Sequence, residues 1–255
     1  MASDLLVFFT AFSIANFIAV QLTTIYLHRA MTHGAVTFPG WFLAVAKFLI
    51  WTHTSIVPKR WVGVHRHHHA NADEEGDPHS PWIFGFWKVQ FWNVILYTRA
   101  TQDEEMVERH TRDIPYTNLD HLLFKRGKLG VLLGGATYFF ALGMPGLLGF
   151  VVSGLSYAFI QSATINGLGH YPSVIAQRNY DEDHAQQSQN LRFPGKLQWL
   201  LTWYLGGEEN HNNHHYAPGS AYFAHFPEKG ELDLGGMIIR GLARLGVATK
   251  VHAQF

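Results

Sequence analysis

The sequence has no cysteine among its 255 residues. This absence excludes disulfides, thiolate metal sites, cysteine-ligated iron–sulfur clusters and cysteine nucleophiles. Charge is also scarce, because Asp, Glu, Lys and Arg make up 15% of the residues, against about 25% in a typical soluble domain. The 19 basic and 19 acidic residues cancel, and this balance argues against a nucleic-acid-binding protein.

Charged residues are missing from two long segments. The first, 5–26, contains none and is long enough to cross a bilayer as a helix. A secretory signal peptide is the competing interpretation, but no basic residue precedes the run and no small-residue cleavage site follows it. The second, between Lys128 and Arg178, suffices for two spans, with a turn signal from Gly143 to Gly146. We predict spans at about 5–26, 129–144 and 147–168; a buried hairpin in a soluble protein is the alternative for the last two.

A third apolar stretch, 36–57, carries Lys47 as its one charge and fits either a span or a re-entrant or interfacial segment. Aromatic residues interleaved with Lys88 predict an interfacial segment at 82–97, and apolar spacing predicts an amphipathic helix within 231–246. We therefore expect a single all-α domain over 1–255. It would be an integral membrane protein with three or four transmembrane helices, interfacial helices and a cytoplasmic histidine-rich cap.

The distribution of basic residues predicts the orientation. They lie almost wholly in 29–128 and 178–250, and the positive-inside rule then places these segments in the cytoplasm. The N-terminus and the turn at 143–146 would lie outside. This topology requires that 36–57 does not cross to the far side.

Histidine is unusually frequent, with 17 residues, and three clusters stand out: His28 to His33, His65 to His69, and His211 to His215. Offsets of three and four place imidazoles of the second and third clusters on one helical face. The offset of five in the first cluster is about 140° off that face on a regular helix, so we expect its second histidine past the helix end or across the site. His170 ends the second hairpin arm, four residues after Asn166.

Three clusters on one side of a membrane indicate metal binding. Imidazole suits Zn, Cu, Fe and Ni, and a structural zinc site takes four ligands. Eight or nine imidazoles are too many for one ion, so two ions are the economical interpretation. A hydrocarbon-lined surrounding favours iron and oxygen chemistry, whereas two zinc ions and a hydrolase stay open at this point.

The three clusters, in this order and with this membrane pattern, resemble those of the integral-membrane fatty acid desaturases, most closely the acyl-CoA (stearoyl-type) branch, over nearly the whole chain. The second cluster matches that branch in His65-Arg66-x-His68-His69, continuing to Asp77-Pro78-His79, and the third matches it in Gly207-Glu208-x-x-His211-Asn212-x-His214-His215, preceded by Ser188-x-Asn190. In addition, Asn166-x-x-x-His170 resembles the extra ligand pair of that branch. One departure is that the family usually has two spans before the first cluster, whereas one fits here.

The resemblance implies a non-haem di-iron centre and dioxygen as co-substrate. The implied ligands are His28, His33, His65, His68, His69, His170, His211, His214 and His215, with Asn166 acting through a water. Glu208 is the first candidate for orienting these imidazoles, followed by Asp77 and Glu209, the last of which a solvated carboxylate explains equally well. The remaining histidines are not implied ligands: His53, His67, His79, His110, His121, His184, His225 and His252.

The family reaction is dioxygen-dependent removal of two hydrogens from adjacent methylenes of an acyl chain, with no catalytic side chain beyond the metal centre. The acyl donor could be acyl-CoA, acyl-carrier protein or lipid-linked. Because no His-Pro-Gly-Gly haem-carrier motif occurs, we expect a separate electron donor such as ferredoxin, rubredoxin or a haem carrier. Substrate-binding residues stay unassigned; Trp61, Trp199, Trp203 and Tyr204 suit either a substrate slot or ordinary membrane packing.

Two rival functions stay open. A hydroxylase or acetylenase could use the same scaffold, and product analysis would separate these from a desaturase. A non-catalytic membrane metal-binding or transport protein is the rival from another class. Transport would need polar residues through the spans, and 5–26 and 129–165 offer few.

Overall fold

The computed structural model describes residues 2–182 and 185–254, and most of them are helical. The expectation of an all-α chain needs one correction. A short antiparallel pair of strands, β1 (Ala176–Gln177) and β2 (Asn190–Leu191), closes the segment between the second hairpin arm and the third histidine cluster.

The first apolar run forms α1 (Ala2–Leu22), which continues as a π-helical segment, Thr23–Thr32. Together they are long and apolar enough to cross a membrane. The continuous helix therefore extends past the predicted end at 26 and carries the first histidine cluster into the interior of the protein.

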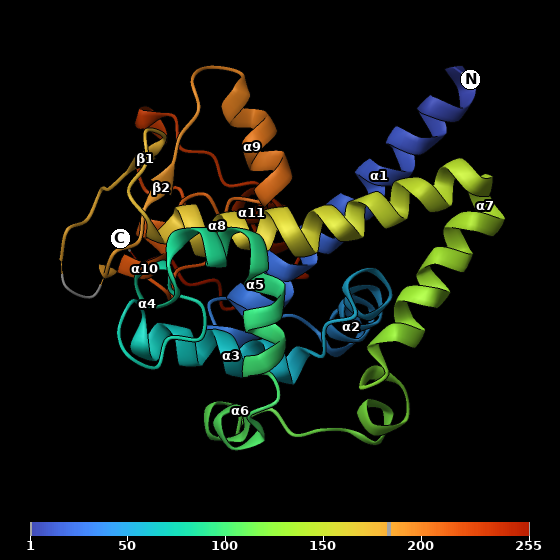
Figure 1. Cartoon of the computed structure of the whole chain (residues 1–255), viewed down its shortest axis with the longest axis horizontal. Helices are drawn as coiled ribbons and strands as arrows, with labels where there is room; N and C mark the ends of the chain where they lie inside the picture. Colours follow the sequence, from blue (N-terminus) through green and yellow to red (C-terminus); the bar gives the residue numbers. More distant parts are fainter. Residues whose placement is uncertain (1, 183–184, 255) are drawn as a thin grey trace.

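The second apolar run forms a continuous helical path from Gly127 to His170, also long and apolar enough to cross a membrane. It comprises α7 (Gly127–Ser156), a π-helical turn (Tyr157–Gln161), α8 (Ser162–Gly167) and a 3₁₀ turn (Leu168–His170). The path bends sharply within α7 (Figure 1), where Gly143 has a φ of 69° and Pro145 follows. The two arms of the predicted hairpin are helical, and glycine permits the bend because it lacks a Cβ.

Glycines explain how closely α7 packs on its neighbours. A Cβ at Gly149 would lie 2.4 Å from the carbonyl oxygen of Phe8 in α1, and one at Gly130 would lie 2.4 Å from that of Trp51. Ala11 and Ala15 of α1 pack with Tyr138 and Phe150 of α7 in a buried cluster. The glycine-rich first arm is therefore a packing surface.

The third apolar stretch forms α2 (Gly40–Thr54), followed by α3 (Pro58–Asn71) at an angle of 85°. The break lies at Ser55, which has a φ of 60°. At 1.5 Å per residue the 15 residues of α2 measure about 22 Å, short of the ~30 Å hydrocarbon core. The pair is a broken span or a re-entrant segment, so the expectation for 36–57 stays a prediction.

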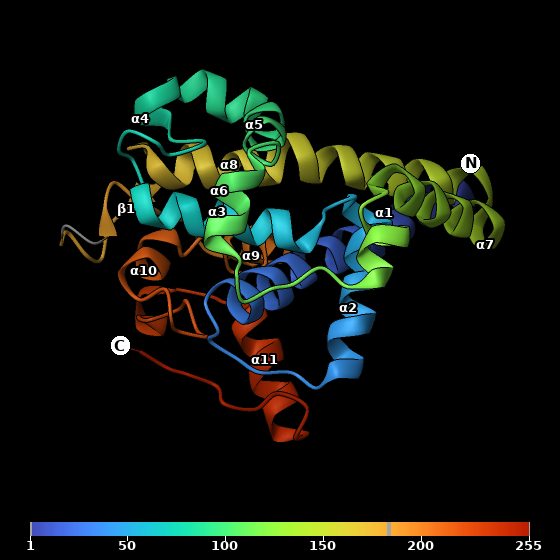
Figure 2. The same cartoon turned by 90° about the horizontal axis from the view of Figure 1, so that it is seen from below.

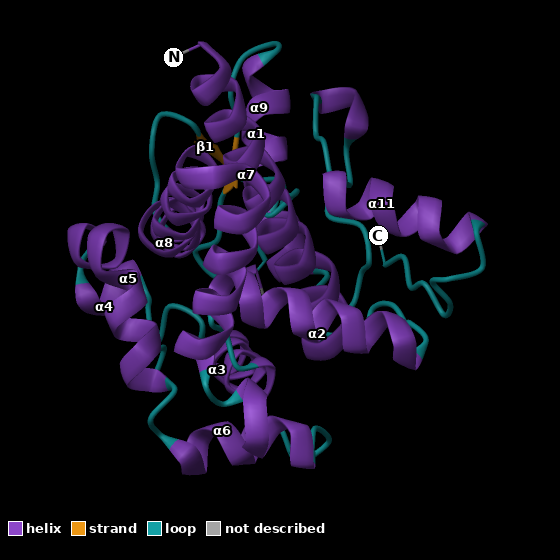
Figure 3. Ribbon diagram, turned by 90° about the vertical axis from the view of Figure 1, so that its right-hand side faces the viewer, coloured by secondary structure: helices purple, strands orange, loops and turns teal. Residues whose placement is uncertain are grey.

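The remaining helices surround this framework. Figures 2 and 3 show α4 and α5 on one side of α1 and α3, and α11 on the other. Trp87 in α5 is 70% exposed, and several neighbouring aromatic side chains are also exposed. These helices are α4 (Pro81–Phe84), α5 (Phe86–Ala100), α6 (Glu104–His110), a π turn (Asp120–Phe124), α9 (Leu197–Leu205), α10 (His211–Tyr216), a 3₁₀ turn (Pro227–Lys229) and α11 (Leu234–Arg244).

The C-terminal helix α11 is fastened to the first histidine cluster. Asp233 caps it by accepting a hydrogen bond from the backbone of Gly236, and it also forms a buried ion pair with Arg29 at 2.8 Å. The predicted amphipathic helix is confirmed, because Ile238 and Leu242 pack against a buried apolar cluster whereas Arg240 and Arg244 are exposed. The helix ends at Arg244, within the predicted stretch 231–246.

Candidate metal centre

The first histidine cluster is shaped by the π-helical segment. The backbone N–H of His33 donates to the carbonyl of His28 at 3.2 Å, an i to i−5 bond, and His33 lies just past the helix end. The two imidazole centroids are 5.1 Å apart. The 140° divergence expected on a regular helix is removed because the wider π turn brings the two side chains to one side.

The second cluster lies on α3, where His65, His68 and His69 face the interior of the protein. His67 points elsewhere: its Nδ1 is 3.2 Å from Nε2 of His110, on the far side of the helix. The sequence prediction that separates His67 from its neighbours agrees with this placement.

The third cluster forms α10, whose six residues are too few to hold a helix alone. Asparagine side chains fix it in place. The side-chain Oδ1 of Asn190 accepts from the backbone N–H of Asn212 at 3.0 Å, and the side-chain Nδ2 of Asn213 donates to the Glu231 carboxylate at 2.7 Å. His211, His214 and His215 are consequently buried in fixed positions.

The structure brings all nine implied ligands together, in two groups. Within each group, one nitrogen from every ring lies within 4.8 Å of the others. The five-histidine group comprises His28, His33, His65, His69 and His214, and the four-histidine group comprises His68, His170, His211 and His215. The second and third clusters each contribute histidines to both groups, so the two groups lie next to each other between α3 and α10.

Carboxylates accept hydrogen bonds from the Nδ1 atoms of three of these rings, which are His28, His68 and His170. Glu208 accepts from Nδ1 of His28 at 2.8 Å and also binds the Thr24 hydroxyl. Asp77 accepts from Nδ1 of His68 at 2.9 Å. Both were candidates from the sequence. A ring whose Nδ1 donates to a carboxylate keeps Nε2 free to act as a metal ligand.

Two further orienting residues escaped the sequence analysis. Asp73 accepts from Nδ1 of His170 at 2.8 Å, and the Gln186 side-chain oxygen contacts Nδ1 of His215 at 2.9 Å. Asp73 lies four residues before Asp77, and this Asp-x-x-x-Asp spacing was the one available signal. No local pattern marks Gln186, because its partner lies 29 residues away.

Glu209 lies in a different environment from the solvated one that the sequence left open. It is fully buried, so a solvated carboxylate is the wrong description. It contacts the Thr202 hydroxyl and accepts from the backbone N–H of Gly207 at 3.1 Å. Burial raises its pKa to about 7, although the bond from Thr202 acts in the opposite direction. The hydrogen bonds of its carboxylate to described residues go to Gln198, Thr202 and Gly207, and we assign it a role in the loop before α10.

The donor set fits metal ions. Nε2 of His28 lies 2.9 Å from Nε2 of His214, and the same distance separates the Nε2 atoms of His170 and His211. Two nitrogens at about 2.1 Å from one ion and 90° apart would be about 3.0 Å from each other. The Nε2 atoms of His68 and His215 are buried without a hydrogen-bond partner among the described residues.

The protonation states are also suitable for ligation. Burial, reinforced by neighbouring imidazoles, lowers the pKa of His211, His214 and His215 well below the usual range. The same causes lower the pKa of His33. Neutral imidazole is the ligating form, so these rings need not lose a proton to bind a metal.

The other histidines fall outside the two groups. His79 is buried beside His68 and forms a third possible metal-binding group with His68 and Asp77. The family resemblance does not imply His79 as a ligand. His53 contacts Tyr138 within the α2–α7 packing. His184 lies outside the described residues. Asn166 donates to Asn93 at 3.0 Å rather than to a ring.

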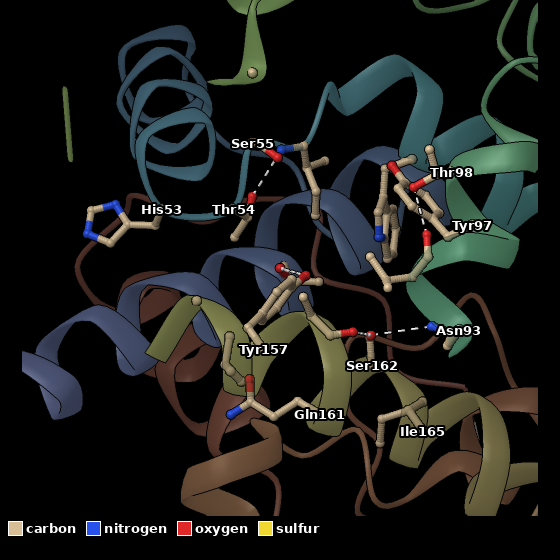
Figure 4. Close-up of a pocket in the computed structure, with 18 of the residues that line it drawn as sticks. His53, Thr54, Ser55, Asn93, Tyr97, Thr98, Tyr157, Gln161, Ser162 and Ile165 are labelled. Atoms are coloured by element: carbon tan, nitrogen blue, oxygen red, sulfur yellow. Dashed lines mark hydrogen bonds between the residues drawn. The ribbon is translucent and has the colours of Figure 1, made fainter. Parts of the chain in front are cut away.

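A cavity of about 760 Å³ adjoins the histidines, within the size range of small-molecule sites. His28, His65, His211 and Asn166 are among the residues that line it. Tyr97, Tyr157 and Ile165 also belong to the lining (Figure 4). Among the four aromatic residues considered for a substrate slot, Trp61 and Tyr204 line the cavity, whereas Trp199 is 54% exposed and, like Trp203, is not among the described lining residues.

A helical protein with candidate membrane spans, two buried histidine groups and an adjoining cavity has the features of a membrane metalloenzyme. Residues 3–228 match the fatty acid desaturase family, and the chain belongs to this family. It is 31% identical over 243 residues to the sn-1 stearoyl-lipid 9-desaturase of Anabaena variabilis, covering 89% of this chain and 77% of that protein.

Two other relatives differ in the acyl donor that their names give. The chain is 30% identical over 239 residues to Delta-9 acyl-lipid desaturase 1 of Arabidopsis thaliana, covering 89% of this chain and 70% of that protein. It is 26% identical over 252 residues to the acyl-CoA C20 Delta5-desaturase of Anemone leveillei, covering 96% and 73%. The family is thus confirmed, and the assignment to the acyl-CoA branch stays a proposal.

Proposed function

We propose that this protein introduces a double bond into a fatty acyl chain at a non-haem di-iron centre, as a member of the stearoyl-type branch. The observation that carries the proposal is the pair of histidine groups beside a cavity. Each group offers enough nitrogen ligands for one ion, and the lining gives an acyl chain access to both.

The nine histidines of the two groups would hold the irons, with Asn166 contributing through a water. When bound, the ions would supply the dioxygen-dependent oxidation that an unactivated C–H bond requires. The overall reaction takes an acyl –CH2–CH2– unit, dioxygen, two electrons and two protons to –CH=CH– and two waters. The electrons would come from a separate donor such as ferredoxin, rubredoxin or a haem carrier.

The chain's own residues have three tasks. Glu208, Asp73 and Asp77 orient ligand rings and favour the tautomer that presents Nε2. Burial of the histidines keeps bulk water away from the reacting carbon. The cavity wall, including Trp61 and Tyr204, would fix which methylenes lie next to the metal pair.

The orientation of the protein is part of the proposal. The charge distribution places the histidine groups on the cytoplasmic side of the membrane and the N-terminus outside. The convergence of the three clusters supports one side for all of them, because they cannot be divided by a bilayer.

The test is metal analysis and product mapping on purified protein. We expect two irons per chain and, with reductant and stearoyl donors, a double bond at one position. About one metal per chain, or chiefly zinc after growth in iron-replete medium, would contradict the di-iron centre. A hydroxylated product would assign the chain to the hydroxylase alternative.

A pair of variants tests the ligand set. His214→Ala removes a ring of the five-histidine group, and His67→Ala removes a neighbouring ring that contacts His110. We expect loss of turnover and of iron in the first variant only. Equal losses at matched folding would show that the groups are misassigned.

A further inference from the structure

Most of the fixed charges that line the cavity are positive. Among its described lining residues, the lysines and arginine are Arg60, Lys125 and Lys128, and the carboxylate is Glu208. Glu208 is bonded to Nδ1 of His28. The three cations therefore have no ion pair with a carboxylate of the described lining.

Packing contacts bring the two segments that carry these three cations close together. The Tyr116 ring has the Lys125 ammonium 3.8 Å from its centroid and the Lys59 ammonium at 4.9 Å, which places the start of α7 beside the first turn of α3. A Cβ at Gly127, between the two lysines of the lining, would lie 2.5 Å from the carbonyl oxygen of Ser55. Thr54 and Ser55 are themselves part of the cavity lining (Figure 4).

The competing acidic partners at this end are weak. Arg60 lies 3.4 Å from Glu104, whose side chain is 83% exposed, and an ion pair in that environment contributes little. Lys125 lies over the Tyr116 ring and 3.4 Å from Nδ1 of His121. A cation over an aromatic ring keeps its full charge, so Lys125 can still attract an anion that enters the cavity.

The cavity also reaches the lipid-facing side of the helical framework. Val151 and Leu155 of α7 line it and are 43% and 53% exposed. They lie in a segment apolar enough to cross a membrane. An acyl chain could therefore enter sideways from the bilayer while its head group stays at the water–lipid boundary.

We propose that Arg60, Lys125 and Lys128 bind the phosphate of a phospholipid head group while an acyl chain of that lipid occupies the cavity. This inference rests on the proposed function, since it takes the cavity as the acyl site. Three converging cations suit a phosphate better than a neutral sugar head group, and the side opening favours a lipid donor over a soluble thioester.

Photo-cross-linking of the purified full-length protein in a neutral glycoside detergent tests the proposal without needing turnover. The probes carry one diazirine-labelled stearoyl chain on phosphatidylglycerol, on monogalactosyldiacylglycerol or on coenzyme A, and labelled residues are mapped by mass spectrometry. Each of the three cations attracts an anionic lipid, and solvent screening reduces this attraction. We therefore expect about tenfold more cavity labelling by the phosphatidylglycerol probe than by the galactolipid probe.

The triple variant R60Q/K125Q/K128Q should erase this preference, and K125R/K128R should retain it. The matched control R240Q/R244Q/K250Q removes three exposed cations elsewhere and should label like the unmodified protein. Size-exclusion profiles and iron content verify that the variants fold.

Three results would overturn the proposal: equal labelling by the galactolipid, a preference that survives in R60Q/K125Q/K128Q, or stronger labelling by the coenzyme A probe. Stronger labelling by the coenzyme A probe would mean that the cations bind a phosphate of acyl-CoA and that the acyl donor is not a phospholipid. Selective labelling without any double-bond formation would instead contradict the proposed function.

Discussion

Asp73 is the residue whose replacement tests the four-histidine group most directly. Its carboxylate accepts from Nδ1 of His170 at 2.8 Å, from the Ser80 hydroxyl at 2.8 Å and from the backbone N–H of Gln187 at 3.1 Å. Its side chain is 4% exposed. Asp73→Ala would leave the buried His170 ring without its anchor, and the Ser80 hydroxyl and the Gln187 backbone N–H would lose the same acceptor.

The size of the effect follows from these bonds. Leaving a buried donor unpaired costs about 1–3 kcal/mol, which corresponds to a roughly 10- to 100-fold weaker hold on the metal of that group. Asp73→Asn can keep all three contacts if the amide nitrogen turns toward Ser80, so only the charge assistance is lost. A loss of about tenfold or less is expected for this variant.

Chelator titration of the iron-loaded protein measures this effect. Because the histidine that Asp73 holds, His170, belongs to the four-histidine group, Asp73→Ala should release one of the two irons at lower chelator concentration and leave the other unchanged. Asp181, which is 88% exposed and paired with Arg178, provides the control substitution Asp181→Ala. Unchanged iron release in Asp73→Ala, or equal release in the control, would refute the assigned role.

Three further predictions concern the ligand shell, packing and topology. Gln186→Ala removes one neutral hydrogen bond to a third-cluster histidine, so iron affinity should fall less than in the aspartate variant, by about tenfold or less. Gly149→Ala places a Cβ 2.4 Å from a backbone oxygen of α1, so it should lower the free energy of unfolding by about 1–3 kcal/mol and reduce the melting temperature, whereas Gly154→Ala meets nothing within 4 Å; similar melting of both would contradict the packing. A cysteine at Ser3 should react with an impermeant thiol reagent in intact cells and one at the exposed Glu75 only after lysis; labelling of the latter in intact cells would show that α2 and α3 cross the membrane.

The sequence by itself identified the apolar helices and the ligand types. Hydropathy is a local property, so the runs that form α1 and α7 could be found without any knowledge of packing. The spacing of three and four in the second and third clusters is equally local, because one helical face is set by the backbone alone. The family resemblance rested on the same short motifs.

The tertiary structure decided how those parts meet. The π turn that aligns His28 with His33 departs from the regular helix that spacing assumes. The division into groups of five and four depends on how α3 lies against α10. The spacing within one cluster reveals neither this division nor the placement of the two helices. Asp73 acts on a ring 97 residues away, and the cations of the cavity mouth come from α3 and the start of α7. Such pairings depend on where glycines allow helices to approach, which is a property of the packed chain rather than of any one segment.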